Sequence, residues 1–375
     1  MKIAIYSNSS KGGCYEYAKE IAREYANNPE CESIEALFPK NAAFVKGSKN
    51  ILISDCPGKI FPGPLKKIHF ILRSIINPVK AFGYARKNDI DLLIFNDFDQ
   101  LIPGLWVWLY KKRKFKTVVI LHDPDRTAYF KYKSLSINTM TKFMSIIDIG
   151  FYHEYLPELP YYKNPKIKFE KIPHGIYPVP QADKETSIKI NNLKEKGFKV
   201  ISVVGNIRFE KNYVCIMNAL KNIDNAVLII AGQCVTSKEN IQTYKDAARK
   251  LGVDNKVIFV NKYLTQNELA SYYQDSSLIL LYYKNSFKSQ SGILNGIISY
   301  STPIIISDIN CAMTETAKKY KIAQIVEPDN AQKLSQAINN LEEVNIENRK
   351  IFISENSWRK NIEIQINTYK NIIGK

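Results

Sequence analysis

Residues 199–212 read KVISVVGNIRFEKN and combine an apolar strand, a glycine turn and two cations. Lys199–Val204 is rich in β-branched residues, which is typical of a strand buried in a parallel sheet. Gly205 ends this run, and Arg208 and Lys211 come just before a helical pattern. A strand, a short loop and a helix in this order indicate a βα unit, in which ligands bind at the carboxyl end of the strand.

The second half of the chain repeats this alternation. Predicted strands are Lys199–Val204, Ala226–Ala231, Lys256–Val260, Leu278–Tyr282, Pro303–Ser307 and Ile322–Val326. Predicted helices are Asn212–Leu220, Asn240–Leu251, Gln266–Gln274, Gly292–Tyr300 and Ala331–Leu341. The helix at Gln266 starts with a capping box, formed by Thr265 and Glu268. These elements predict a Rossmann-like α/β domain.

The first half has the same pattern and predicts a second Rossmann-like domain. Its predicted strands are Lys2–Tyr6, Ile34–Leu37, Asn50–Ser54, Asp91–Phe95, Thr117–Leu121 and Ile147–Phe151. Its predicted helices are Tyr15–Tyr25, Leu65–Arg86 and Leu101–Lys112. Two domains suit a chain of 375 residues, because a domain commonly has about 150 residues.

The alternation breaks at Ile172–Pro180, which contains three prolines and a glycine. With the polar stretch that follows to Lys189, this segment predicts a linker. We therefore expect domains at 1–178 and 179–356. The segment from Ser357 to the C-terminus is loosely amphipathic and predicts a closing helix, 357–375, that we assign to the first domain.

Composition restricts the partners. The chain has 53 Lys and Arg against 36 Asp and Glu, a net charge of +17, which attracts nucleic acid, anionic lipid or phosphorylated substrates alike. No nucleic-acid-binding module is recognisable, so we expect no nucleic acid partner. No apolar run is long enough to span a membrane, and Met1–Ser7 reads as a strand rather than a signal peptide. The six cysteines are scattered, which favours reduced thiols and a cytoplasmic protein.

Two segments carry groups suited to anions. Arg208 and Lys211 can neutralise a diphosphate, although the same two cations fit an ordinary solvated loop. Ser291-Gly292 begins a predicted helix, whose free amides and dipole attract a phosphate, although Ser291 also fits a plain N-cap. Both segments follow predicted strands, so we expect them to face the same cleft.

The first half offers a smaller set of candidates. Predicted strand Thr117–Leu121 delivers His122 and Asp123 to its carboxyl end, where His122 is placed to hydrogen-bond a transferred sugar or simply to order its loop. The turn at Gly12-Gly13 lacks the GxGxxG pattern and fits the approach of an acceptor as well as it fits a dinucleotide.

Together these segments resemble the nucleotide-sugar glycosyltransferases of the GT-B fold, in particular the large retaining group 1, which includes sucrose synthases and bacterial mannosyltransferases. The resemblance covers nearly the whole chain in short pieces: Gly12-Gly13, His122-Asp123, Pro173-His174-Gly175, Gly205 with Arg208 and Lys211, Gln290-Ser291-Gly292, Ser301-Thr302-Pro303, Ser307-Asp308 and Ser357-Trp358. It implies two Rossmann-like domains facing a cleft, with the C-terminal helix crossing back to the first domain.

The resemblance also implies roles for individual residues. Arg208 and Lys211 would bind the donor diphosphate next to Gly205 and Asn206, and Gln290-Ser291-Gly292 its distal phosphate. The backbone at Asn261, Lys262 and Tyr263 would meet the base. Gly12, Gly13, His122 and Asp123 would bind the acceptor, with His122 also touching the donor sugar. The expected donor is a UDP- or GDP-linked sugar, and neither a further cofactor nor a metal is expected.

One departure from the family pattern concerns two glutamates spaced eight residues apart. Counting back from Pro303 places Lys288 and Gly296 at these positions, so the contacts to the donor sugar and ribose are missing. Gln290-Ser291-Gly292 resembles the version of this loop found in some subgroups, and Glu315 is a candidate replacement. A catalytically silent partner or scaffold protein is therefore the alternative to an active enzyme.

The resemblance implies front-face transfer with retention, in which the leaving phosphate accepts the proton of the acceptor hydroxyl. An inverting variant would need His122 or Asp123 as its base. The implied acceptor is a glycan or lipid-linked saccharide of a surface polysaccharide, lipopolysaccharide or glycoconjugate.

Two basic stretches of the first half also carry apolar and aromatic residues, Pro64–Arg73 and Leu105–Lys114. Basic amphipathic helices suit an anionic membrane surface, although the same pattern fits helices that pack on a sheet with lysines in solvent. We expect peripheral contact with the inner face of the cell membrane.

Overall fold

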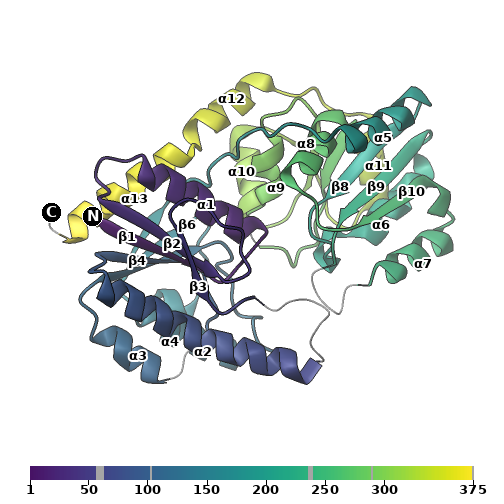
Figure 1. Ribbon diagram of the computed structural model, residues 1–375. Helices are drawn as coiled ribbons and strands as arrows, with labels where there is room; N and C mark the ends of the chain where they lie inside the picture. The colour runs from purple at the N-terminus through teal and green to yellow at the C-terminus, as the bar shows by residue number, and fades with distance from the viewer. Residues whose placement is uncertain (56–62, 102–103, 235–239, 289, 374–375) are drawn as a thin grey trace. The chain divides into compact units, whose positions relative to one another are not determined.

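The structure is a computed structural model that describes residues 1–55, 63–101, 104–234, 240–288 and 290–373. Cys56 lies outside the described residues. The chain divides into two compact units, one of residues Met1–His174 with Trp358–Lys375 and the other of Gly175–Ser357 (Figure 1). The C-terminal segment therefore belongs to the first unit.

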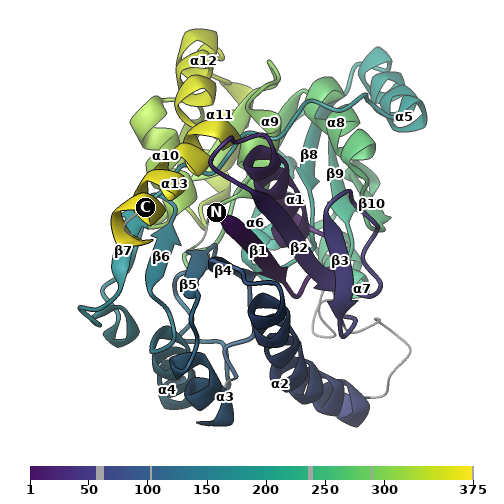
Figure 2. The same ribbon diagram turned by 60° about the vertical axis from the view of Figure 1, so that its left-hand side comes forward.

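The first unit is a seven-stranded parallel sheet in the order β3-β2-β1-β4-β5-β6-β7. The strands are β1 (Lys2–Ser7), β2 (Ser33–Pro39), β3 (Ser48–Leu52), β4 (Leu92–Asp97), β5 (Lys116–Leu121), β6 (Ile149–Tyr152) and β7 (Lys168–Lys171). The helices are α1 (Gly13–Ala26), α2 (Gly63–Lys87), α3 (Gly104–Lys111), α4 (Lys133–Met144) and α13 (Trp358–Ile373). Helices α2, α3 and α4 lie on one side of this sheet, and α1 and α13 on the other (Figure 2).

The second unit is a six-stranded parallel sheet in the order β10-β9-β8-β11-β12-β13. The strands are β8 (Lys199–Val204), β9 (Ala226–Gly232), β10 (Val257–Asn261), β11 (Leu278–Leu281), β12 (Ile304–Ser307) and β13 (Gln324–Val326). The helices are α5 (Lys184–Glu195), α6 (Tyr213–Ala219), α7 (Ile241–Leu251), α8 (Gln266–Asp275), α9 (Gly292–Ile297), α10 (Ala312–Tyr320), α11 (Ala331–Asn339) and α12 (Ile346–Glu355). Two Rossmann-like parallel sheets are the predicted fold class.

The strands are apolar because both faces of each sheet are covered. Strand β9 is buried along its whole length, and the same holds for β11 and β12. Burying aliphatic side chains stabilises the fold by about 25 cal/mol for each Å² of apolar surface removed from water. This is why the sheets could be predicted from apolar runs alone.

Tyr17 of α1 anchors α13 to the first unit. Its ring packs edge-on against Trp358, with ring centroids 4.9 Å apart, and against His174 at 5.1 Å. The buried amide of Asn361 donates to the Tyr17 hydroxyl at 2.9 Å and to the Pro173 carbonyl at 2.6 Å. Buried polar groups need such partners, so these contacts fix the C-terminal helix on the unit, as the predicted fold requires.

The sequence prediction was wrong about the end of the linker. Residues up to Lys189 were assigned to it, but helix α5 begins at Lys184, where Asp183 accepts a hydrogen bond from the Thr186 amide at 2.9 Å. The helix has one buried residue, Ile190, so its sequence lacks the apolar periodicity that identifies a helix. Helix α9 ends at Ile297 rather than the predicted Tyr300. Four elements were not predicted: β7, α4, α10 and α12.

The capping box predicted at Thr265 is present, with both reciprocal hydrogen bonds to Glu268. Among the described residues, no helix is both long and apolar enough to cross a membrane.

Replacing Asn361 by Ala should destabilise the first unit by about 2 kcal/mol or more, because the buried Tyr17 hydroxyl and Pro173 carbonyl lose their donor. Urea denaturation of the full chain measures this. Asn371→Ala, at an exposed position of the same helix, is the matched control and should change stability by less than about 0.5 kcal/mol. Equal effects of the two substitutions would show that Tyr17 does not anchor α13.

Candidate functional site

Two glycines hold the ends of β8 and β9 together. Gly205 follows β8 with a φ of +86°, in the left-handed region that favours glycine. A Cβ atom on Gly232, the last residue of β9, would lie 2.1 Å from the carbonyl oxygen of Gly205. No side chain fits at position 232 while that carbonyl keeps its place. The Ile207 amide then donates to the Gln233 carbonyl at 2.9 Å, which continues the contact along the loop.

Lys211 is a buried cation at the end of this loop, with 5% of its surface exposed. Its Nζ donates to the Val204 carbonyl at 2.5 Å, and among the described residues it has no ion-pair partner. Burial, followed by the nearby charge of Arg208, lowers the pKa of Lys211 to about 7. A buried ammonium without a counter-ion is costly, so an anion arriving here would stabilise its charged form.

Arg208 stands on the same loop with its side chain exposed. The loop is attached to the segment after β11, because the Lys284 amide donates to the Glu210 carbonyl at 2.7 Å and its Nζ lies 4.9 Å from the centre of the Phe209 ring. Arg208 makes no ion pair within the described part of the chain. Both cations of the loop are thus available to an anion.

The start of α9 offers two backbone amides. The Ser291 amide already donates to Gln290 Oε1 at 3.1 Å, and the Leu294 amide donates to Ser291 Oγ at 3.4 Å. The amides of Gly292 and Ile293 have no hydrogen-bond partner among the described residues. A Cβ on Gly292 would meet no atom within 4 Å, so the space in front of these amides is open.

The Gly205 loop and the start of α9 lie against each other. A Cβ at Gly205 would be 3.0 Å from Ile293 Cδ1 and 3.5 Å from Lys211 Nζ. Strands β8 and β11, which precede the two segments, are neighbours in the sheet. Two cations and two amides therefore lie together at the carboxyl ends of these strands, an arrangement that suits a dianionic group such as a diphosphate.

At one of the two positions where the family pattern has a glutamate, the structure leaves little space for a side chain. A Cβ on Gly296 would lie 3.0 Å from Cε2 of Tyr273 and 3.1 Å from its hydroxyl. The buried Tyr273 of α8 therefore takes the space that a glutamate at this position would need. Lys288 Nζ donates to the Asn310 carbonyl at 3.4 Å and cannot replace a carboxylate.

The other predicted donor residues are placed as follows. Asn261, Lys262 and Tyr263 are exposed at the end of β10, and Asn261 Oδ1 accepts from the Cys234 amide at 3.4 Å. Lys262 is paired with Glu268 of the capping box, which raises the pKa of Lys262. Asn206 is half-buried in the Gly205 loop.

Helix α10 carries Glu315 and, next to it, the hydrogen-bond partner of Gln290. Gln290 Nε2 donates to the Thr316 hydroxyl at 3.1 Å, and the exposed Glu315 precedes Thr316 in the first turn of that helix. Glu315 makes no ion pair within the described residues.

In the first unit, the predicted acceptor residues follow two strands, β1 and β5, which flank β4 in the sheet. Gly12, with a φ of +86°, and Gly13 open α1, whose first turn has no side-chain cap. Asp123 is exposed just beyond β5. A Cβ on either glycine would meet no atom within 4 Å, so the backbone here is open to a ligand.

His122 is fixed in one tautomer. Asn96 donates its amide to the Cys14 carbonyl at 2.8 Å, so its Oδ1 accepts from His122 Nε2–H at 3.1 Å. Burial, followed by the neighbouring His174, lowers the pKa of His122 to about 3. His122 is therefore neutral at physiological pH, with the lone pair on Nδ1. Asn96 was not predicted from the sequence, because its role appears only when β4 and β5 are paired.

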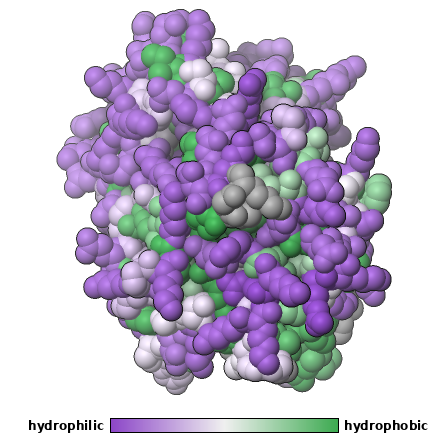
Figure 3. Space-filling view, turned by 90° about the vertical axis from the view of Figure 1, so that its left-hand side faces the viewer, coloured by the Kyte–Doolittle hydropathy of each residue, from purple (hydrophilic) through white to green (hydrophobic). Residues whose placement is uncertain are grey.

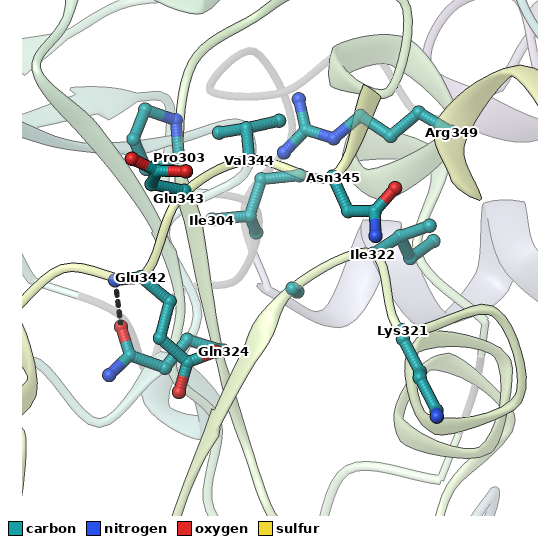
Figure 4. Close-up of a pocket in the computed structure, with 11 residues that line it drawn as sticks. Pro303, Ile304, Lys321, Ile322, Gln324, Glu342, Glu343, Val344, Asn345 and Arg349 are labelled. Carbon is teal, nitrogen blue, oxygen red and sulfur yellow. Dashed lines mark hydrogen bonds between the residues drawn. The ribbon is translucent and has the colours of Figure 1, made fainter. Parts of the chain in front are cut away.

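A hollow of about 340 Å³, including space open to solvent, lies at the amino-terminal ends of β12 and β13 in the second sheet (Figure 4). The buried Arg349 lines it and donates to the Thr302 carbonyl at 3.0 Å, and the Glu342 amide donates to Gln324 at 3.5 Å. These bonds hold α12 and its preceding loop on the sheet. In the described part of the chain, no group of three His, Cys, Asp or Glu side chains is arranged to hold a metal ion.

Comparison with known proteins identifies the second unit. Residues 183–359 match the family described as glycosyl transferases group 1. Sucrose-phosphate synthase from Thermosynechococcus elongatus has a similar structure, with a TM-score of 0.72 at 13% identity over 99% of both chains. HepE from Anabaena, solved in complex with UDP-glucose, has a TM-score of 0.73 at 12% identity over 98% of this chain and 100% of HepE.

WaaG, a glycosyltransferase involved in lipopolysaccharide biosynthesis, has a TM-score of 0.60 at 15% identity, over 96% of this chain and 93% of WaaG. No curated protein matches the sequence. Similarities at this level of identity establish the fold, which is GT-B.

The pKa of Lys211 predicts how diphosphate binding depends on pH. A bound diphosphate favours the ammonium form, so the pKa of Lys211 is higher in the complex than its value of about 7 in the free protein. At a pH above 7, binding therefore takes up a proton. The affinity for UDP should therefore fall as the pH rises above neutrality. Calorimetry at about pH 8.5 in two buffers of different ionisation enthalpy should detect uptake of up to one proton.

Lys211→Met should bind UDP more weakly and without this proton uptake. Lys284→Met removes an ammonium group from the neighbouring loop and should keep the uptake. Buffer-independent binding by the wild-type protein would show that no diphosphate reaches Lys211.

Proposed function

We propose that this group 1 glycosyltransferase transfers a sugar from a nucleoside diphosphate sugar to a glycan or lipid-linked saccharide, in the synthesis of a surface polysaccharide, lipopolysaccharide or glycoconjugate. The observation that carries the proposal is the junction of Gly205, Lys211 and Ile293, where two cations and two backbone amides lie at one sheet edge without an anionic partner in the described residues.

The donor would be bound by the second unit. Arg208 and Lys211 bind the diphosphate, and the Gly292 and Ile293 amides bind its distal phosphate. The exposed backbone at Asn261–Tyr263 meets the base. A UDP-linked sugar is the first candidate because HepE, which shares the fold, was solved with UDP-glucose, and a GDP-linked sugar is the second. The two cations compensate the charge of the leaving diphosphate, so transfer needs no metal ion.

Transfer with retention fits the state of His122. The bond between the anomeric carbon and the phosphate oxygen breaks as the acceptor oxygen bonds to the same face, and the acceptor proton passes to the released phosphate. A base is effective when its pKa lies near the working pH, whereas that of His122 is about 3. His122 therefore acts as a neutral hydrogen-bond acceptor through Nδ1, suited to a sugar hydroxyl.

A catalytically silent partner or scaffold protein is the second candidate. It is favoured by the absence of both family glutamates, since Lys288 and Gly296 occupy their positions and Tyr273 fills the adjoining space. Such a protein would bind the nucleotide and release no sugar from any donor.

The acceptor side is proposed to meet the inner face of the cell membrane. Helix α2 exposes Leu65, Ile68, Leu72 and Val79, which are spaced to form one stripe. On α3, Trp108 is exposed with Lys112 Nζ 4.0 Å from its ring centre, whereas Trp106 and Tyr110 are buried. Elsewhere the surface is largely hydrophilic on the face in Figure 3. An apolar stripe beside Lys66 and Lys67 suits an anionic lipid surface.

The donor site predicts a nucleotide-dependent gain in stability. At a concentration of 100 times Kd, the preferred nucleoside diphosphate should stabilise the protein by about 2.7 kcal/mol. Thermal denaturation with UDP, GDP, CDP, ADP and TDP measures it. The double variant Arg208→Ala with Lys211→Ala should lose the gain, whereas Arg249→Ala with Lys250→Ala, on α7, should keep it.

Sugar release distinguishes the two candidates. Steady release of the nucleoside diphosphate by the wild-type protein, abolished in the Arg208 and Lys211 double variant, would exclude the silent protein. Nucleotide binding with no sugar release from any donor would exclude the enzyme. Unchanged turnover in the double variant would show that the donor site is elsewhere.

The α2 stripe predicts binding to anionic vesicles. Replacing Ile68 and Leu72 by Ser should weaken flotation with phosphatidylglycerol vesicles about tenfold or more, because two apolar side chains leave the lipid. Ile346→Ser with Ile351→Ser, at two exposed apolar positions of α12, is the matched control and should bind as the wild type does. Equal binding of both double variants would rule out α2 as the membrane contact.

A further inference from the structure

A β-bulge interrupts the pairing of β1 with β4. Tyr6 is paired with Phe95, but the next residue, Ser7, is paired with Asp97, so Asn96 is an extra residue in β4. Bulges of this kind redirect side chains and occur often beside active sites. Here the bulge lies at the carboxyl ends of two central strands, beside the loop that leads to Gly12.

Asn96 and Asp97, the two residues at the bulge, make different hydrogen bonds. Asn96 joins the Cys14 carbonyl to His122 and fixes the tautomer of the histidine. Asp97 is half-buried at the strand end, and its Oδ2 accepts a short hydrogen bond from the Ser9 hydroxyl. Its other oxygen, Oδ1, has no hydrogen-bond partner among the described residues. Oδ2 of the carboxylate is therefore held in place, while Oδ1 is available to a ligand.

Asp99, the carboxylate nearest to Asp97 in sequence, already has its hydrogen-bond partners. Asp99 is bound by both Arg73 Nε and Nη2, at 3.0 Å each, and also accepts from Tyr129 and Asn8. Asp99 and Arg73 neutralise each other as a bidentate pair. Burial and the nearby Asp99 raise the pKa of Asp97, and the Ser9 hydrogen bond opposes this rise.

Arg126 supplies a fixed donor on the same edge. Its guanidinium carbon lies 4.4 Å from the centre of the Tyr129 ring and 5.0 Å from that of Phe98. Its Nε donates to Gln100 Oε1 at 3.1 Å and its Nη2 to the Phe98 carbonyl at 3.2 Å. Within the described residues it makes no ion pair, although its charge lowers the pKa of Asp97. Stacking and hydrogen bonds thus orient the guanidinium, which makes no direct ion pair.

We propose that Asp97 and Arg126 are the acceptor-binding residues of the first unit and that they recognise neighbouring hydroxyl groups of an uncharged saccharide. The carboxylate accepts from one hydroxyl and the guanidinium donates to the next, with His122 Nδ1 accepting from a third. Their formal charges cancel, as do those of Arg73 and Asp99, so the pair selects a neutral sugar over a phosphorylated one. This inference rests on the proposed transferase function.

Saturation-transfer NMR on the full chain tests the proposal. The probes are methyl α-glucopyranoside, methyl α-galactopyranoside and methyl α-mannopyranoside, each with UDP present, and glucose 6-phosphate for comparison. At least one methyl glycoside should give a signal with the wild type. Asp97→Asn should weaken its binding about 10- to 100-fold, as expected for the loss of a charge-assisted hydrogen bond. The UDP signal should be unchanged.

Asp125→Asn is the matched control, because Asp125 lies on the same edge and holds its turn through Oδ1, which asparagine retains. It should bind the sugars normally. Arg126→Gln provides a second test that does not depend on how well Asp97→Asn folds, and it should also weaken sugar binding. Arg126→Lys keeps the charge and loses the planar fork, so it should restore binding only in part.

The outcomes separate the two claims. If the methyl glycosides bind to Asp97→Asn and Arg126→Gln with the same affinity as to the wild type, this inference is overturned. Binding of UDP in the same experiment would leave the proposed function unaffected. UDP signals without any sugar signal, or tighter binding of glucose 6-phosphate than of every methyl glycoside, would also overturn it. Absence of a UDP signal from the wild type would contradict the proposed function itself.

Discussion

The contact between Gly205 and Gly232 is the constraint on which the proposed donor site depends. The carbonyl oxygen of Gly205 lies where any side chain at position 232 would begin, at 2.1 Å from the ideal Cβ position. This close approach sets the path of the loop after β8. The loop in turn buries Lys211 beneath the Val204 carbonyl and leaves Arg208 at the surface. Two cations are thereby placed next to the unpartnered amides at the start of α9.

In the first unit, a β-bulge takes the place of the glycine contact in positioning side chains at the strand ends. The proposed acceptor-binding side chains lie at the bulge in β4, where the additional residue, Asn96, is the partner of His122 and the next residue, Asp97, accepts from the Ser9 hydroxyl. At these strand ends Asp99 is paired with Arg73, and Asp97 lies within the electrostatic influence of Arg126. Basic residues instead accompany the apolar stripe of α2.

The sequence was sufficient where local chemistry determines structure. Apolar runs predicted twelve of the strands, the capping box at Thr265 was predicted from its spacing, and the place of Arg208 and Lys211 in a loop after a strand was predicted from the glycine turn. It was insufficient where a role depends on pairing across the sheet. Asp97, Arg126 and Asn96 have no motif around them, and α5 lacks an apolar stripe because a single residue of it is buried. The absence of a glutamate at position 296 was visible in the sequence, but the ring of Tyr273 beside this position was not.

Hydrogen–deuterium exchange of the full chain, with and without saturating UDP or GDP, shows whether a diphosphate binds between the loop after β8 and the start of α9. Binding of a diphosphate at the predicted place should slow exchange in two separate segments, Gly205–Asn212 and Gly292–Asn295, because both contain amides that a phosphate would cover. The Lys211→Met variant should show weaker protection of both segments together. Protection confined to other strand ends, with these two segments unchanged, would contradict the account.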